Sequence, residues 1–232
     1  MNTELFITRL VEISTPVRPL APPRWRTICW AALALPYVAL VVFVVAPRGD
    51  LATKLVDANY AVEISAAFAT GLTAAFAAFA TAVPGHNRRI ASLPLFPLAI
   101  WLGSLGHGCI QTLIGPDGLS IHPDWFCVPA IVLVGAIPAI AMALMLRRGA
   151  PLKPHLTAAL GGLAAAGLGD FGLRLFHEQD ASLVVLIWQF GTVFMLTILA
   201  ALAGQYLLNW RSIIEASHFQ AALLATEHSH WS

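Results

Sequence analysis

Six apolar runs, each long enough to cross a lipid bilayer, follow one another along the 232 residues of the chain. A helix needs about 20 apolar residues to span the hydrocarbon layer, because each residue adds only about 1.5 Å. Backbone polar groups inside the layer must be hydrogen-bonded internally, so runs rich in Ala and Leu form helices there. We therefore predict an all-α, polytopic membrane protein with six transmembrane helices, at residues 27–46, 61–83, 90–114, 126–146, 158–176 and 183–210.

The segments that flank these spans are short and polar. Residues 1–26 carry Glu4, Glu12 and four arginines, which does not fit a secretory signal peptide. Four prolines between 16 and 23 favour an extended tether. We predict three parts: a cytoplasmic N-terminal helix and Pro-rich tether (1–26), a six-helix transmembrane domain (27–210) and a cytoplasmic C-terminal tail (211–232).

Lysine and arginine gather on alternate connections between the spans. The connections on the side of both termini hold ten: Arg9, Arg18, Arg24, Arg26, Arg88, Arg89, Arg147, Arg148, Lys153 and Arg211. The opposite connections hold only Arg48 and Lys54. Basic connections stay in the cytoplasm, so we predict a multi-pass membrane protein with both termini cytoplasmic. Four tryptophans at span ends fit interfacial positions: Trp25, Trp30, Trp125 and Trp210.

Few ionisable residues lie inside the predicted spans. Asp170 and Arg174 are four apart in the fifth span, where they would pair along the helix, although an ion or proton relay is an alternative. Glu63 is expected at the outer mouth of the second span. Cys29 is expected to be a buried apolar side chain. Small residues recur every fourth position in 158–169, which indicates close helix packing rather than a transport path.

Coordinating side chains gather on the outer side. Cys109 and Cys127 lie at the outer ends of adjacent spans, with His107, His122 and His177 as helper ligands. Three interpretations remain open: a disulfide or redox pair, a soft-metal site, or structural thiols. None of the close-spaced zinc motifs is present, and no cofactor is expected.

Residues 1–15 have the pattern of a short amphipathic helix. Leu5, Phe6, Leu10 and Ile13 form an apolar stripe, and Glu4 and Glu12 lie on a polar one. Such a helix either lies on the membrane surface or binds a groove of a partner protein.

The order of several segments resembles the NrsF family of six-span inner-membrane anti-sigma factors. The segments are 16–24 (Pro-Val-Arg-Pro-Leu-Ala-Pro-Pro-Arg), 82–85 (Ala-Val-Pro-Gly), 101–109 (Trp-Leu-Gly-Ser-Leu-Gly-His-Gly-Cys), 124–127 (Asp-Trp-Phe-Cys), 147–154 (Arg-Arg-Gly-Ala-Pro-Leu-Lys-Pro) and Trp188. The resemblance implies negative regulation of an extracytoplasmic-function (ECF) sigma factor, which the cytoplasmic face would hold at the membrane. It also implies that periplasmic cysteines sense stress.

One departure from the family pattern affects this sensing role. Family members carry a cysteine after a histidine between the fifth and sixth spans, whereas here Glu178 follows His177. Either Cys109 pairs with Cys127, or His177 replaces a thiol ligand, or sensing is lost.

The prediction is thus a regulatory protein that binds a sigma factor and the bilayer, with no direct contact to nucleic acid. A small transporter or metal-efflux component is the alternative, but it would need polar groups lining a path. No constellation of catalytic residues is apparent, so we do not expect an enzyme. The sequence does not determine the oligomeric state.

Overall fold

The computed structural model describes Thr3, Ile7, Thr8 and residues 20–85, 87–114, 127–177 and 185–208. Within these ranges the regular structure is helical and contains no strand, which confirms the predicted fold class. Six helical stretches are long and apolar enough to cross a membrane. The long helices are α2 (Pro23–Val45), α4 (Ala58–Thr81), α5 (Leu95–Ile114), α6 (Cys127–Leu146), α7 (Pro154–Phe176) and α9 (Gly191–Leu207).

Three shorter elements were not predicted. They are α3 (Leu51–Val56), the 3-10 helix η1 (Arg88–Ser92) and the π-helix η2 (Val185–Phe190). The predicted span 90–114 therefore divides into η1 and α5. Pro94 and Pro97 lie around the first turn of α5, where their missing N–H groups are tolerated, and Leu98 N–H donates to the Pro94 carbonyl at 3.1 Å.

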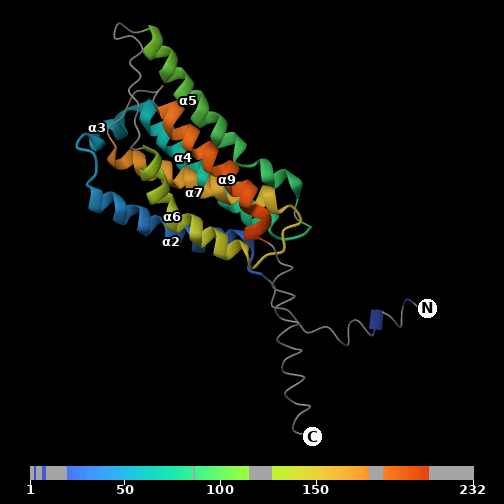
Figure 1. Cartoon of the computed structure of the whole chain (residues 1–232). Helices are drawn as coiled ribbons and strands as arrows, with labels where there is room; N and C mark the ends of the chain where they lie inside the picture. Colours follow the sequence, from blue (N-terminus) through green and yellow to red (C-terminus); the bar gives the residue numbers. More distant parts are fainter. Residues whose placement is uncertain are drawn as a thin grey trace.

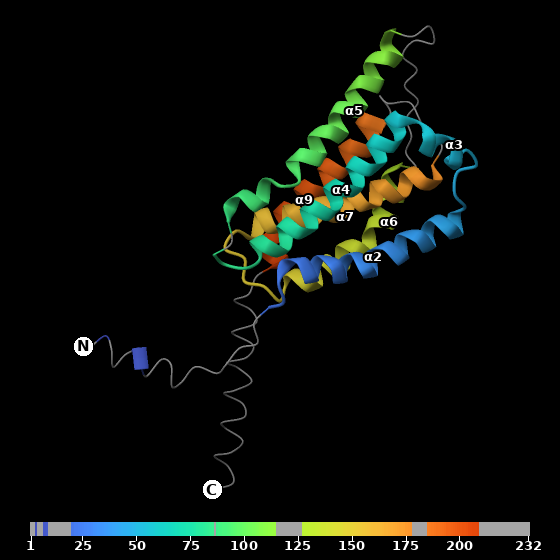
Figure 2. The same cartoon turned by 180° about the vertical axis from the view of Figure 1, so that it is seen from behind.

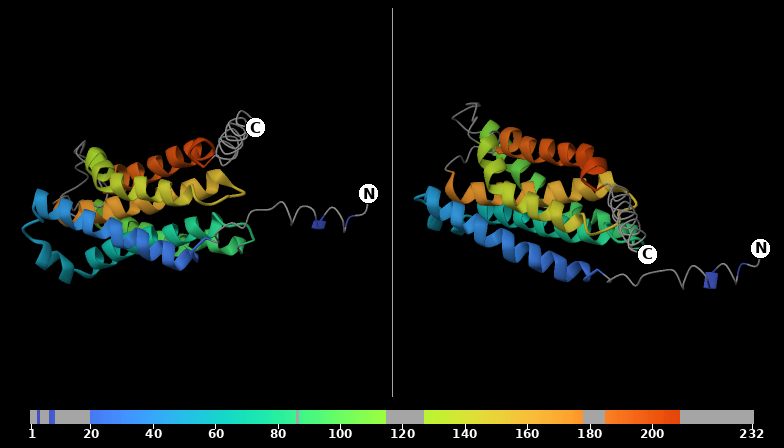
Figure 3. Two further views of the ribbon diagram at one scale, coloured as in Figure 1. Left: turned by 90° about the horizontal axis from the view of Figure 1, so that it is seen from below. Right: turned by 60° about the horizontal axis from the view of Figure 1, so that its bottom comes forward.

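Helix α7 occupies the middle of the bundle. It packs against α4, α6 and α9, while α2 and α5 lie at opposite sides of the molecule (Figures 1 and 2). The chain enters α2 and leaves α9 at the same end of the bundle (Figure 3). We call this the basic end, because it carries Arg24, Arg26, Arg89, Arg147, Arg148 and Lys153.

The small residues of α7 are packing surfaces. A Cβ atom added at Gly162 would lie 2.5 Å from the Cβ of Ala200 on α9. One added at Gly169 would lie 2.7 Å from the carbonyl oxygen of Ile131 on α6. Both distances are shorter than real Cβ contacts, so the packing interpretation is confirmed for this stretch.

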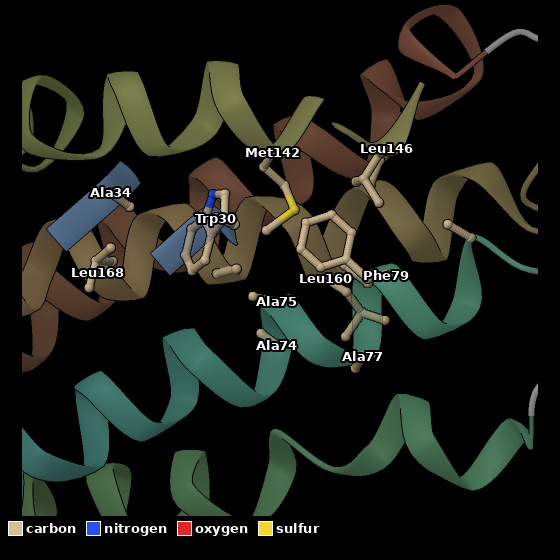
Figure 4. Packing of buried hydrophobic residues seen from close by; sticks show 14 of the residues in the cluster. Trp30, Ala34, Ala74, Ala75, Ala77, Phe79, Met142, Leu146, Leu160 and Leu168 are labelled. Carbon is tan, nitrogen blue, oxygen red and sulfur yellow. The ribbon is translucent and has the colours of Figure 1, made fainter. Parts of the chain in front are cut away.

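The main core joins α2, α4, α6 and α7. Trp30, Phe79 and Met142 enter it from three different helices (Figure 4). Trp30 is fully buried and its indole Nε1–H donates to the Pro138 carbonyl at 2.9 Å. The prediction of an interfacial Trp30 was therefore wrong, because the residue lies two turns inside α2 on its inward face. Trp25 is 55% exposed, as expected, whereas Trp125 and Trp210 lie outside the described residues.

The outer surface of the bundle is apolar. Phe43, Phe96 and Leu202 are among its exposed side chains, as expected where lipid replaces water. Cys29 is also exposed, which corrects the prediction that it is buried. Its neighbour Trp30 occupies the inward-facing position instead.

Candidate functional site

Arg48 links the end of α2 to the end of α7. It is only 4% exposed, although the sequence places it in a loop. Its backbone N–H donates to the Leu175 carbonyl at 3.1 Å, and its guanidinium donates to the His177 carbonyl at 3.4 Å. Two further donors of the guanidinium contact Asp50 at 2.6 and 2.9 Å. Arg48 therefore neutralises the Asp50 carboxylate and places a positive charge near the C-terminus of α7, which is favourable.

The ring of Tyr60, in the first turn of α4, lies beneath two arginines. The guanidinium carbons of Arg174 and Arg48 lie 4.9 and 5.5 Å from its centroid. The hydroxyl of Tyr60 donates to the Arg174 carbonyl at 2.6 Å. Cation–π attraction and this hydrogen bond together hold α4 to α7 at the end opposite the basic end.

Arg174 pairs with Glu63 on α4 rather than along its own helix. Its Nη2 donates to Oε2 of Glu63 at 2.9 Å, and both side chains are buried. The predicted ion pair between Arg174 and Asp170 was therefore wrong, whereas Glu63 lies near the outer start of α4, where the second span was expected to begin. Helices α4 and α7 approach closely where Gly71 meets Gly167, which brings Glu63 within reach of the long Arg174 side chain.

Asp170 and Gln189 are two further buried polar side chains within the spans. A neighbouring apolar cluster contains Ala66, Ala67, Trp101, Leu105, Ala166 and Val193. Glu63, Asp170 and Gln189 each lie about one helical turn from a member of this cluster, displaced toward the end opposite the basic end. We call Glu63, Asp170, Arg174 and Gln189 the polar layer.

Two members of the polar layer keep unsatisfied polar atoms. Oδ1 of Asp170 and both amide heteroatoms of Gln189 are buried without a hydrogen-bond partner within the described part of the chain. Buried polar atoms of this kind are costly and are therefore uncommon in purely structural positions. Gln189 lies in η2, and π-helical turns are frequent at functional sites. The polar layer is thus the strongest functional candidate among the described side chains.

The structure describes the predicted sensor residues only in part. Cys109 lies in α5, about one turn beyond Leu105, and Cys127 is the first residue of α6. Their side chains, and all of His122, lie outside the described residues. His107 is exposed, whereas His177 ends α7 with its N–H bonded to the Leu173 carbonyl at 2.9 Å. Among the described side chains, no three His, Cys, Asp or Glu residues form a group that could hold a metal ion.

Sequence reasoning missed Arg48, Tyr60 and Gln189. Arg48 was counted only as a loop charge, and Tyr60 and Gln189 carry no charge that would single them out. A search for polar residues within apolar spans would have found Gln189. The predicted partner-binding residues Leu5, Phe6, Leu10 and Ile13 lie outside the described residues.

A family model described as negative regulator of sigma F matches residues 10–210. The chain belongs to this family, NrsF. The match covers all six long helices and the polar layer. No curated protein and no solved structure matches the chain.

NrsF membership identifies the chain as a negative regulator of a sigma factor, and its six apolar helices are consistent with a multi-pass membrane protein. The match begins at residue 10, so Leu10 and Ile13 lie within it and Leu5 and Phe6 lie before it. It ends at residue 210, so the tail 211–232 lies beyond it.

Proposed function

We propose that the protein is a membrane-bound anti-sigma factor of the bacterial inner membrane. It would sequester an ECF sigma factor on its cytoplasmic face and release it on envelope, oxidative or heavy-metal stress. The observation that carries this proposal is the family match over residues 10–210. Capture of the cognate sigma factor by the tagged, detergent-purified protein tests it. Failure to capture it, together with metal transport in vesicles, would favour the transporter alternative.

The orientation proposed here rests on the separation of charge. The four carboxylates with described positions, Asp50, Asp57, Glu63 and Asp170, lie in the half of the bundle opposite the basic end. Under the positive-inside rule the basic end faces the cytoplasm. A reporter fused at residue 120 should be active outside the cytoplasm and one fused at residue 150 inside it. A periplasmic signal from a C-terminal fusion would contradict this topology.

The sigma factor would be bound by the N-terminal helix. Its apolar stripe (Leu5, Phe6, Leu10 and Ile13) matches helix-in-groove recognition. Deleting residues 1–15 should raise expression of the sigma regulon while the protein stays in the membrane. If the truncated protein represses as well as the intact one, the binding surface lies elsewhere, and the connections at 88–89 and 147–153 are the next candidates.

Sensing would begin at Cys109 and Cys127, with His107, His122 or His177 as helper ligands. Cys109 follows Leu105, and Leu105 packs in the cluster next to the polar layer. A disulfide or a soft-metal bond there would shift α5 against α4, and α4 carries Glu63. Moving a repressor from 99% to 1% bound takes about 5.5 kcal/mol. Covalent or coordinate bonds supply this, whereas a surface ion pair contributes only about 0–1 kcal/mol.

Serine substitution tests this sensing step. Cys109→Ser and Cys127→Ser should each blunt induction by oxidants or thiophilic metals while repression persists. Cys29→Ser is the matched control, because Cys29 is exposed near the basic end. A double Cys109/Cys127 variant that responds to these stresses as the parent does would show that both thiols are structural.

A further inference from the structure

Arg26 is a buried arginine near the start of α2. It is only 6% exposed. Its Nη2 donates to the carbonyl of Met145 on α6, and its guanidinium carbon lies 4.6 Å from the centroid of the Phe79 ring on α4. Its Nη1 is buried and has no hydrogen-bond partner within the described ranges. Nη1 is thus a strong donor that lacks an acceptor among the described residues.

The described charged residues at the basic end are all positive. Arg148, an exposed residue just after α6, brings a second positive charge to this end of the bundle. Among the described residues at this end, in 20–30, 78–85, 87–98, 143–157 and 200–208, none is Asp or Glu. A buried guanidinium with an unused donor, at an end that carries further arginines and no described carboxylate, favours an anion.

The depth of Arg26 indicates the source of that anion. Phe79 lies two residues before the end of α4, and Met145 lies one residue before the end of α6. At about 1.5 Å per residue, the guanidinium lies within one turn of the helix ends. The adjacent Trp25 is 55% exposed, as expected for a side chain at the boundary between headgroups and acyl chains. Lipid phosphates already occupy this depth, whereas an acidic segment of a soluble partner would have to enter the membrane.

We propose that Arg26 and Arg148 form a binding site for the phosphodiester of an anionic phospholipid at the basic end, between α2 and α6. Nη1 of Arg26 donates to a phosphate oxygen, and Arg148 approaches the same phosphate from the exposed side. Basic pockets between transmembrane helices are known sites for anionic headgroups. The bound lipid would tie α2, and with it the N-terminal tether, to α6.

The experiment uses the full-length protein in neutral detergent. Its bound lipid is first removed, and phosphatidylcholine is then added as a background lipid without net charge. Phosphatidylglycerol is titrated in, and binding is followed by native mass spectrometry and by the midpoint of thermal unfolding. The intact protein should show saturable stabilisation. Arg26→Gln should weaken apparent affinity about tenfold or more, as expected for loss of a charge-assisted hydrogen bond. Arg148→Gln should weaken it severalfold, and because Arg148 is exposed this variant keeps the test valid if Arg26→Gln does not fold.

Arg24→Gln is the matched control, because it removes the same charge from an exposed position two residues away. It should bind phosphatidylglycerol as the intact protein does. If the apparent affinity for phosphatidylglycerol falls equally in Arg24→Gln, Arg26→Gln and Arg148→Gln, binding depends only on general surface charge. That result would overturn the proposed site. Equal stabilisation by inorganic phosphate at matched ionic strength would also overturn the proposal, since the ligand would then be a free anion. Absence of any response to phosphatidylglycerol would do the same.

Discussion

Replacing Glu63 with glutamine removes the negative charge that faces Arg174 and keeps nearly the same shape. The two charged groups lie 2.9 Å apart. At an effective dielectric constant of about 20, their direct attraction is about 6 kcal/mol. The net loss is smaller, because the glutamine carbonyl still accepts a hydrogen bond and needs less desolvation. We expect Glu63→Gln to lower the free energy of unfolding by about 1.5–3 kcal/mol.

Asp170 should limit that loss. It lies one turn before Arg174 on α7, so an ionised Asp170 carboxylate would face the same guanidinium. When Glu63 is neutralised, Asp170 remains as a second carboxylate for the guanidinium. Asp170→Asn alone should cost less than about 1 kcal/mol, because Oδ1 has no hydrogen-bond partner within the described residues. The double variant removes both carboxylates of the polar layer and should cost about 3–5 kcal/mol, as for a broken buried pair.

The free energy of unfolding of all three variants can be measured by equilibrium unfolding in mixed micelles. The fraction of sodium dodecyl sulfate is raised, and unfolding is followed by circular dichroism and tryptophan fluorescence. Asp57→Asn is the control, because this exposed residue caps α4 and asparagine caps equally well. The cost of the double variant should exceed the sum of the single costs. Additivity within about 0.5 kcal/mol would refute the role of Asp170 as a second counter-charge. If Glu63→Gln leaves the free energy of unfolding unchanged, the stabilising role of the pair is refuted.

The same unfolding assay tests two further predictions. Gly169→Ala should lower the free energy of unfolding by about 1–3 kcal/mol, because its Cβ would meet the Ile131 carbonyl. Gly103→Ala, whose Cβ would meet no atom within 4 Å, should raise it by up to about 1 kcal/mol. Equal effects of the two substitutions would contradict the packing argument. Arg48 lowers the pKa of Asp50, chiefly through its hydrogen bond. The resulting stability is present above the ordinary carboxylate pKa of about 4 and is lost as pH falls through the lower folded value. Asp50→Asn should flatten this acid-side loss, and an unchanged pH profile would show that the pair does not stabilise the fold.

The polar layer illustrates where sequence reasoning stopped. Asp170 and Arg174 could be recognised because charged residues are rare within apolar runs. Their partners could not be predicted from the sequence, because an arginine side chain can reach either one turn along its own helix or across to a neighbouring helix. The close approach of α4 and α7 decided in favour of Glu63. Gln189 is buried because η2 turns it inward, and no periodicity in 183–210 predicts a π-helix.

The sequence by itself determined that the chain forms six long apolar helices, and it placed most of the flanking Lys and Arg residues on one side of them. Those conclusions depend only on the length of the apolar runs and on the positions of the charged residues. The thickness of the bilayer sets the length of a span, and basic residues set its orientation. The tertiary structure decided which face of each helix is buried. In a soluble helix the polar face reveals the buried one, but a lipid-facing side is as apolar as the core. For this reason Trp30 and Cys29, adjacent in one span, were each assigned to the wrong environment until the packing of α2 against α4 and α6 was known.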